Sequence, residues 1–420
     1  MSLMETLLPG RKNIVILGAG FGGITAILRL HRLLKQKGLL KTYTPVLVDR
    51  NAYHLYTATL YEIAAIPRGE ASASALKSTI CIQVSDVIDR FPEIHFIGER
   101  VQGLDAERRT ITFTSGNELA FEYVVVALGA EINFFGIPGL SQSSHPLKTF
   151  EDAVRLRNHV EGVVAKKPEV IRIIVGGGGA TGVELSAEFM NFLSHVKKQS
   201  GAESSRVELT IIEAGPEILG GFDPNVIKNV RRRLQSLGIT MLTASPIGRV
   251  TESAVILNSG RAISFDILIW SGGVKPASAI ANFGLPLDKR GGIVVNEFLE
   301  AKPRIYAIGD SASFMNATTG KPLPGNVPVA ESGAHIVAEN IVAQITGRTQ
   351  TSLRPLTHYP FILAVGGKYA VADLGAIKFF GFLGWVLKQL VELRYLLVIL
   401  PFKKAITMWL RSVYYTSAND

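Results

Sequence analysis

Two glycine-rich segments with the same spacing carry the clearest chemistry in this 420-residue sequence. Each follows an apolar run typical of a buried strand and leads into a helix pattern. In G-x-G-x-x-G the first glycine permits a tight turn, the second lets a pyrophosphate approach, and the third lets helix and strand pack. We therefore expect two dinucleotide cradles. Their glycines are Gly18, Gly20 and Gly23 in "GAGFGG", and Gly177, Gly179 and Gly182 in "GGGATG".

An acidic residue ends the strand-like run after each glycine segment. Asp49 closes "TPVLVD" and Glu213 closes "RVELTIIE". Such a carboxylate accepts hydrogen bonds from a ribose diol, or is simply an exposed acid at a strand end. No basic residue directly follows Glu213, which favours a free 2′-hydroxyl over a 2′-phosphate. The second cradle is thus predicted to take NADH.

Two further apolar runs end on small residues. "YVVVALGA" covers 123–130, and "RIYAIGDSASF" covers 304–314. Small residues at strand ends let a cofactor pass close to the backbone. Asp310 is placed to accept hydrogen bonds from a polyol chain, to cap the next helix, or both.

With these marks, and with "IWSGGV" at 269–274, nearly the whole chain resembles the flavoproteins that have two dinucleotide-binding domains. The resemblance implies an α/β fold with two Rossmann-like domains, one for FAD and one for NAD, the second inserted into the first. We expect the FAD domain at 11–150 and 285–368, and the NAD domain at 151–284. A C-terminal amphipathic, helical, membrane-anchoring region is expected at 369–420.

Within that superfamily the chain looks most like type II NADH dehydrogenase, the single-subunit NADH:quinone oxidoreductase. Disulfide reductases and sulfide:quinone oxidoreductases need a cysteine pair, whereas Cys81 is alone. "NAYHLYTATLYEIAA" at 51–65 resembles a flavin-side segment of the family. "GVELSAEF" places Glu184 where the family has an acid between the nicotinamide and quinone sites. Its alternative is an acid that favours the positive end of a helix.

The resemblance also implies the cofactor contacts. For FAD these are Gly18, Gly20, Phe21, Gly22, Gly23, Ile24, Asp49, Asn51, Ala127, Gly129, Gly309, Asp310, Ala330, Glu331 and Lys378. For NADH they are Gly177, Gly179, Thr181, Gly182, Glu213 and Gly273.

One segment departs from the family. Its A-Q-x-x-x-Q-like pattern should fall in "GNVPVAESGAHIVAENI", 325–341, where neither glutamine is present. One alignment puts Glu331 and His335 in their stead, and another puts Pro328 and Ser332 there. Either way a quinone headgroup would meet different polar groups.

The C-terminus has the composition of helices that lie in a membrane interface. Between 376 and 415, apolar and aromatic residues at helical spacing alternate with Lys and Arg, Glu392 is the only acid, and Pro401 predicts a break. Core packing or dimer formation is the alternative. The tail accounts for part of the net charge of +9. We find no basic stripe with stacking aromatics elsewhere, and so expect no nucleic acid partner.

The resemblance implies an enzyme that passes a hydride from NADH to FAD and two electrons onward to a quinone, without proton pumping. It is expected to be peripheral on the cytoplasmic side of the cell membrane, with a homodimer left open. No metal site is expected, because the eight histidines are scattered and there is one cysteine. The alternatives are a soluble FAD-dependent reductase that serves a ferredoxin-like protein or oxygen, and a non-enzymatic NADH sensor.

Overall fold

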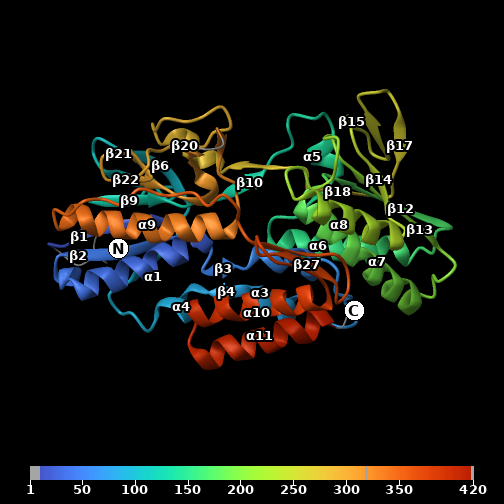
Figure 1. Ribbon diagram of the computed structural model, residues 1–420, viewed down its shortest axis with the longest axis horizontal. Helices are drawn as coiled ribbons and strands as arrows, with labels where there is room; N and C mark the ends of the chain where they lie inside the picture. Colours follow the sequence, from blue (N-terminus) through green and yellow to red (C-terminus); the bar gives the residue numbers. More distant parts are fainter. Residues whose placement is uncertain (1–9, 317–319, 418–420) are drawn as a thin grey trace.

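The computed structural model describes residues 10–316 and 320–417. Two units, each built on a parallel sheet, lie side by side, and the C-terminal helices run along one side of both (Figure 1). The six-stranded sheet of the first unit has the order β21 (Glu300–Lys302), β22 (Ile305–Ala307), β9 (Tyr123–Val126), β1 (Lys12–Leu17), β2 (Tyr43–Val48), β5 (His95–Ile97). All neighbours are parallel except β21 with β22.

The side chains of the first sheet alternate between two layers, as a strand period of two requires. Ile14 and Ile16 face α1 (Phe21–Gln36) and α9 (Val327–Ile345) in one core cluster. Val15 and Leu17 face the opposite cluster, which is covered by a small antiparallel sheet. That sheet consists of β6 (Val101–Asp105), β7 (Thr110–Phe113) and β8 (Glu118–Ala120).

The second unit repeats this plan. Its parallel sheet has the order β11 (His145–Pro146), β18 (Ile267–Trp270), β12 (Val170–Gly176), β13 (Arg206–Ile212), β14 (Thr240–Leu242). Its helices are α6 (Phe150–Val164), α7 (Ala180–Ser200) and α8 (Pro224–Ser236), and its antiparallel cover is β15 (Ile247–Val250), β16 (Ala254–Leu257) and β17 (Ala262–Ser264). Strands β9, β1, β2 and β5 therefore correspond to β18, β12, β13 and β14.

Two antiparallel segments connect the units. β10 (Ala130–Ile132) leaves the first unit, and β19 (Val274–Pro276) returns to it (Figure 1). The chain of the second unit thus runs between two parts of the first. The shorter elements are η2 (Leu39–Lys41), η3 (Thr57–Thr59), α5 (Leu140–Ser143), η4 (Ser278–Asn282), β20 (Ile293–Val294), η5 (Gly309–Ser311), β23 (Ala312–Ser313), β24 (Met315–Asn316) and β25 (Lys321–Pro322).

The C-terminal region is more than a pair of helices. It begins with an antiparallel sheet of β26 (Phe361–Ala364), β27 (Ala370–Asp373) and β28 (Lys378–Gly381). This sheet straddles residue 368, where the sequence suggested a boundary, and its last strand occupies residues that we expected to be helical. β28 pairs with β27 in antiparallel register, which satisfies backbone hydrogen-bonding groups of both strands.

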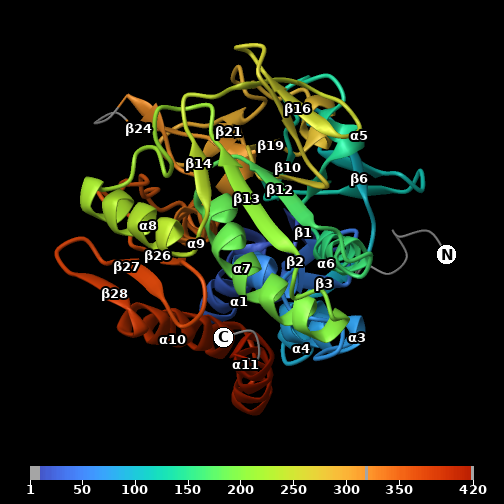
Figure 2. The same ribbon diagram turned by 90° about the vertical axis from the view of Figure 1, so that its right-hand side faces the viewer.

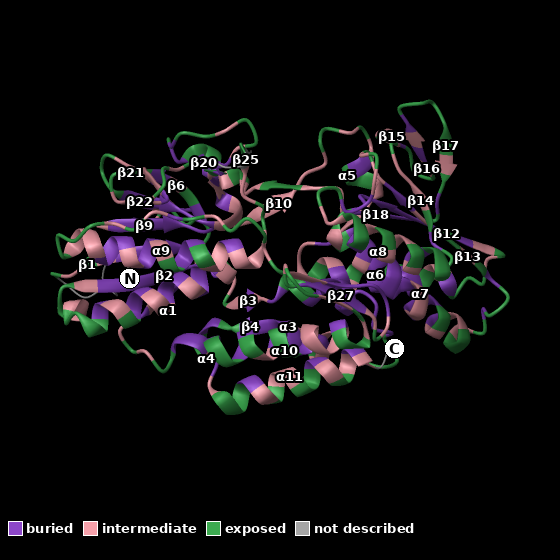
Figure 3. Cartoon of the chain, viewed as in Figure 1, coloured by how far each residue is buried: buried purple, intermediate pink, exposed green. Residues whose placement is uncertain are grey.

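Helices α10 (Phe382–Ile399) and α11 (Phe402–Ser417) follow the sheet, with the expected break at Pro401. α11 packs against α3 (Ala73–Ile80), and α10 lies against the β26–β28 sheet. Side-chain hydrogen bonds join α10 to His54 of β3 (Tyr53–Leu55) and Glu62 of α2 (Leu60–Ile63), and join α11 to Asp86 of α4 (Val84–Ile88). β3 pairs with β4 (Cys81–Gln83), and the two C-terminal helices form one side of the molecule (Figure 2). Exposed residues recur along both helices (Figure 3). Among the described helices, none is long and apolar enough to cross a membrane.

Candidate active site

The first glycine cradle is closed to side chains where the backbone turns and open where a phosphate would sit. Gly18 has φ +109°, and a Cβ there would lie 2.2 Å from the carbonyl oxygen of Ala127. A Cβ on Gly23 would lie 1.8 Å from the oxygen of Gly18. Gly20, the N-cap of α1, has no side-chain cap, and no atom lies within 4 Å of its would-be Cβ. The first N–H groups of α1 therefore face open space, which fits a pyrophosphate.

The second cradle has the same geometry. Gly177 has φ +107°, and its Cβ would lie 2.5 Å from Gly272 Cα. A Cβ on Gly182 would lie 2.0 Å from the oxygen of Gly177. Gly179, the uncapped N-cap of α7, again has open space around it. Thr181 is exposed on the first turn of α7. Both turns therefore leave open space in front of an uncapped helix N-terminus.

The two strand-end acids are held in matching ways. Asp49 accepts the N–H of Ala19 at 2.7 Å and that of Asn51 at 2.8 Å. Burial raises the pKa of Asp49, and the two N–H groups act against that rise. Glu213 accepts the N–H groups of Gly178 and Gly215, both at 2.7 Å. Each carboxylate is thus fixed beside its glycine turn, where an acceptor for a ribose diol is needed.

The edge of the first cradle is completed by η5 and the start of α9. The N–H of Gly129 donates to Ser311 Oγ at 3.0 Å, which ties the end of β9 to η5. Gly309 has φ +59°, and its Cβ would lie 3.3 Å from the Cβ of Ala330. Asp310 lines a cavity at this edge. The end of β9, η5 and the start of α9 therefore meet at one edge of the first cradle.

Several other predicted contacts lie close to their cradle. Phe21 packs edge-on against His54, with ring centroids 4.9 Å apart. A Cβ on Gly22 would lie 3.1 Å from Ile308 Cδ1, and one on Gly273 would lie 2.8 Å from the Phe135 ring. Both glycines therefore allow close packing rather than supply contacts of their own.

The side chains of two predicted contact residues, Ile24 and Lys378, are held by other parts of the protein. The side chain of Ile24 is fully buried in the core, and its N–H donates to the oxygen of Gly20. It supports the turn from behind. Lys378 lies 3.1 Å from Asp223 Oδ2 and 3.8 Å from Asp373 Oδ2, so its charge is paired by carboxylates.

A buried acidic cluster lies beside the second cradle. Glu184, the fifth residue of α7, accepts the N–H of Ala364 at 3.3 Å. Burial raises its pKa to about 8, against the opposing effect of nearby Lys388. Lys388 Nζ lies 2.6 Å from Glu62 Oε1. Burial also raises the pKa of Glu392 to about 7. Helix α10 thus brings an ammonium, Lys388, near Glu184, and its Glu392 is a second protonatable carboxyl beside that lysine.

Sequence reasoning missed Lys388 and Glu62. The lysine looked like one more interfacial cation, and the acid lay inside an apolar segment. The two are 326 positions apart in sequence, so no local spacing relates them. The sequence does contain one indication. Lys388 and Glu392 are four residues apart and so lie on one helix face, and Glu392 is the only acid of the tail, which sets this lysine apart from the other cations.

The segment 325–341 forms the start and middle of α9. Glu331 and His335 line a groove shared with Arg394 of α10, whereas Pro328 and Ser332 do not line it. Burial raises the pKa of Glu331, and Arg394 acts in the opposite direction. Burial lowers the pKa of His335.

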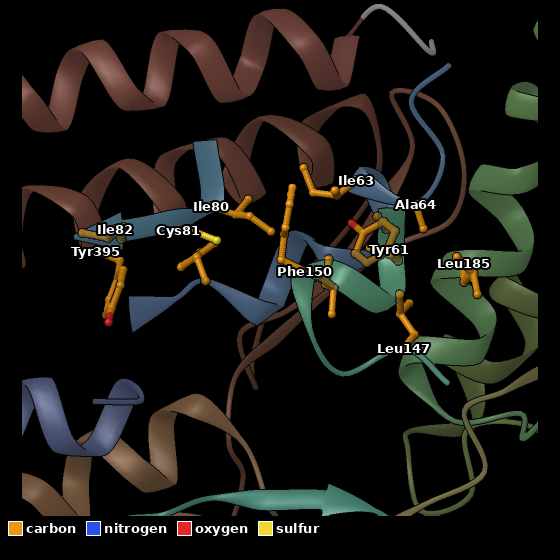
Figure 4. Close-up of a cluster of buried hydrophobic side chains, with 14 of the residues drawn as sticks. Tyr61, Ile63, Ala64, Ile80, Cys81, Ile82, Leu147, Phe150, Leu185 and Tyr395 are labelled. Carbon is orange, nitrogen blue, oxygen red and sulfur yellow. The ribbon is translucent and has the colours of Figure 1, made fainter. Parts of the chain in front are cut away.

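Cys81 lies in a cluster of buried apolar side chains with Ile80, Ile82 and Phe150 (Figure 4). Burial raises the pKa of its thiol to about 12, so little thiolate forms at neutral pH. In 10–316 and 320–417, no group of His, Cys, Asp and Glu side chains could hold a metal ion.

The fold, two cradles and two strand-end acids define a class of pyridine-nucleotide oxidoreductase. A family model described as pyridine nucleotide-disulphide oxidoreductase matches residues 12–334, and the chain belongs to this family. The family's description names disulfide chemistry, which requires a pair of cysteines. This sequence has one cysteine, Cys81.

The names of similar proteins indicate one group within this family. The chain is similar to a protein of Staphylococcus saprophyticus named type II NADH:quinone oxidoreductase, at 26% identity over 80% of this chain and 84% of the relative. A protein of the same name from Staphylococcus aureus is 25% identical over 81% and 84%.

Solved structures share the fold. NDH2 from Plasmodium falciparum, in complex with NADH, has a TM-score of 0.83 and 18% identity over 97% of this chain and 99% of that one. Sulfide:quinone oxidoreductase from Aquifex aeolicus has a TM-score of 0.74 and 17% identity over 97% and 92%.

Proposed function

We propose that this protein is a membrane-associated NADH:quinone oxidoreductase that carries FAD. The observation that carries the proposal is the pair of matched cradles, with Glu184 at the second one in contact with the C-terminal region. The names of the relatives support NADH as donor and quinone as acceptor.

The first cradle fits FAD and the second fits NADH. Gly18, Gly20 and Gly23 would hold the pyrophosphate of FAD, Asp49 its ribose, and Asp310 its ribityl chain. When bound, FAD supplies the two-electron chemistry that links NADH to a quinone. The protein contributes binding, alignment and control of protons.

Glu184 is the proposed proton donor. Forming a quinol takes two protons, and a carboxyl with a pKa of about 8 holds its proton at Oε at neutral pH. Lys388, held by Glu62, lies close enough to oppose the burial effect and so to stabilise the carboxylate once the proton has left. This arrangement gives an acid that can release a proton and take up another.

The C-terminal helices are the proposed membrane anchor. Twelve of the eighteen large apolar side chains that are exposed in the described part of the chain lie between 374 and 414. We call this set the apolar C-terminal face: Leu374, Ile377, Phe380, Phe382, Leu383, Leu390, Val391, Leu397, Val398, Phe402, Leu410 and Tyr414. On α10 they repeat at seven-residue intervals, opposite the buried face, with the exposed Arg394 among them. The exposed cations of α11 are Lys403, Lys404 and Arg411. This suits a helix that lies in a membrane surface.

The expected side is the cytoplasmic one, where the enzyme would meet NADH. Solved quinone-acting structures match 97% of this chain, whereas ferredoxin reductases match 86%. That difference favours a quinone over a ferredoxin as acceptor.

Turnover with defined acceptors tests the function. Purified protein should be yellow, release FAD on denaturation, and oxidise NADH with short-chain ubiquinone or menaquinone far faster than with ferredoxin or oxygen. Ferredoxin reduction at the quinone rate would contradict the proposal, and a colourless protein that takes up no FAD would reject the whole assignment.

The anchor needs surface substitutions rather than deletion, because α10 also buries Tyr395, Leu396 and Ile399 in the core. Leu383→Ser with Phe402→Ser should weaken sedimentation with phosphatidylcholine vesicles. Leu287→Ser with Leu356→Ser, exposed leucines outside the face, is the matched control. Equal sedimentation of both variants would assign the face another role.

A further inference from the structure

A basic groove lies where α1, α9 and α10 meet. Its volume is about 640 Å³. Five cationic side chains line it: Arg29, Arg32, Lys35, Arg90 and Arg394. Glu331 is the one carboxylate in the lining. The groove therefore carries an excess of positive charge that the proposed redox reaction does not use.

Three of these cations are uncommitted. Arg29 is ion-paired with Glu339, and Arg90 donates to the backbone oxygen of Ile399 at 3.0 Å. Arg32, Lys35 and Arg394 are exposed and form no ion pair within the described ranges. Glu331, whose pKa burial raises and Arg394 lowers, is the one carboxylate in a lining with five cations, so an anion bound there would offset the remaining positive charge.

The groove opens onto the apolar C-terminal face. Val398 lines the groove and is 60% exposed. Leu397 and Phe402, which also belong to the apolar C-terminal face, are 40% and 70% exposed. Cationic and apolar surfaces are therefore continuous at the end of α10. A ligand that satisfies both is an amphiphile with an anionic head and an apolar tail.

We propose that this groove binds one anionic phospholipid, with its phosphate among Arg32, Lys35 and Arg394 and its acyl chains along the apolar C-terminal face. The proposal rests on the proposed membrane association. It goes further by assigning a lipid class and a binding site to the protein. Glu331 and His335, which one alignment puts in the family's glutamine positions, line the same groove. A preference for an anionic ligand, which a neutral quinone headgroup would not produce, is therefore what distinguishes the lipid from a quinone here.

Binding of a lipid in its monomeric form tests the groove in the absence of a charged membrane surface. The probe is dihexanoyl phosphatidylglycerol below its critical micelle concentration, measured by titration calorimetry against dihexanoyl phosphatidylcholine and inorganic phosphate. The parent protein should bind the phosphatidylglycerol more tightly than either. Equal binding of the phosphatidylcholine, or of inorganic phosphate, would overturn the proposal.

A matched pair of charge variants locates the site. Arg32→Ser with Lys35→Ser removes two exposed groove cations and should lower phosphatidylglycerol affinity roughly 10- to 30-fold. Lys403→Ser with Arg411→Ser removes two exposed cations of α11 outside the groove and should leave that affinity within about twofold. Equal losses in both pairs would mean diffuse electrostatics and would reject a defined site.

Sedimentation with vesicles distinguishes a failure of the lipid-site proposal from a failure of the proposed membrane anchor. All these charge variants should still sediment with pure phosphatidylcholine vesicles through the apolar C-terminal face. If even the parent fails to sediment there, membrane association has failed; if it sediments but binds no monomeric phosphatidylglycerol, only the groove proposal has failed.

Discussion

The two glycine cradles are built alike but held differently. In the first, the turn's carbonyl oxygen, on Ala19, accepts a hydrogen bond from His54 Nδ1 at 2.8 Å. In the second, the equivalent oxygen, on Gly178, accepts the backbone N–H of Leu219 at 2.8 Å. The first turn is thus fixed by a buried side chain that also contacts α10, and the second by its own unit. This difference suits a cofactor that stays and a substrate that leaves.

The helices that follow the cradles also differ. Two residues after the third glycine, α1 has Thr25 and α7 has Glu184. The backbone device is the same, so binding is shared, and the side chain just beyond it adds proton chemistry to one copy alone. Comparing the cradles therefore separates residues that bind from residues that react.

The largest expected effect is at Glu184. Glu184→Gln should slow electron delivery to quinone by roughly 10²- to 10⁴-fold, the usual cost of losing an acid–base group. The NADH step, measured alone by stopped flow without quinone, should change much less. If the substitution slows only the NADH step, Glu184 positions the nicotinamide instead.

The pH profile sharpens this test. Because the pKa of Glu184 is about 8, the carboxyl is protonated below that pH and loses its proton above it. The parent's quinone step should therefore slow as the pH rises through 8. In Glu184→Gln that inflection should disappear, and an unchanged profile would assign it to another group.

The cradles could be predicted from sequence because their requirements are local. A positive φ at Gly18 and Gly177 needs glycine at fixed spacing whatever surrounds it. The C-terminal helices also follow from local periodicity. Lys378 shows the limit: one lysine in a basic tail resembles the next, and only tertiary packing puts Lys388, rather than Lys378, beside Glu62.

The next largest effects should distinguish the two first glycines. Gly18→Ala forces a Cβ into the oxygen of Ala127 at positive φ, and Gly177→Ala does the same against Gly272. Strain and overlap of about 2–5 kcal/mol would weaken each ligand by roughly 30- to 4,000-fold. Gly18→Ala should purify with little FAD. Gly177→Ala should stay yellow with a raised KM for NADH, and loss of FAD from both would show that the two sites are not independent.

Substitutions of the two strand-end acids should have smaller effects, and each should again affect only the ligand of its own cradle. Glu213→Gln loses a charged acceptor for the ribose diol and the repulsion of a 2′-phosphate, so the preference for NADH over NADPH should fall roughly 10- to 100-fold. Asp49→Asn should leave that ratio unchanged and weaken FAD retention. An equal rate with both nucleotides in the parent would contradict the role given to Glu213.

The smallest effect should come from the link that only the first cradle has. His54 donates from Nδ1 to Ala19, so its Nε2 must accept the hydroxyl of Tyr395 at 2.9 Å. Burial keeps this ring neutral by lowering its pKa from 6.5 to about 4. Unfolding therefore takes up a proton in that range, and stability should decline as the pH falls from 6.5 toward 4.

Tyr395→Phe leaves Nε2 buried without its donor, at a cost of about 1–3 kcal/mol. The melting temperature should drop by a few degrees, and FAD should dissociate several-fold faster because the Ala19 turn is less firmly held. The KM for NADH should not change, since the second turn has no such link. Tyr414→Phe, at an exposed tyrosine of α11, is the control. If Tyr395→Phe lowers the melting temperature without changing FAD release, the link stabilises the helix packing and not the cradle.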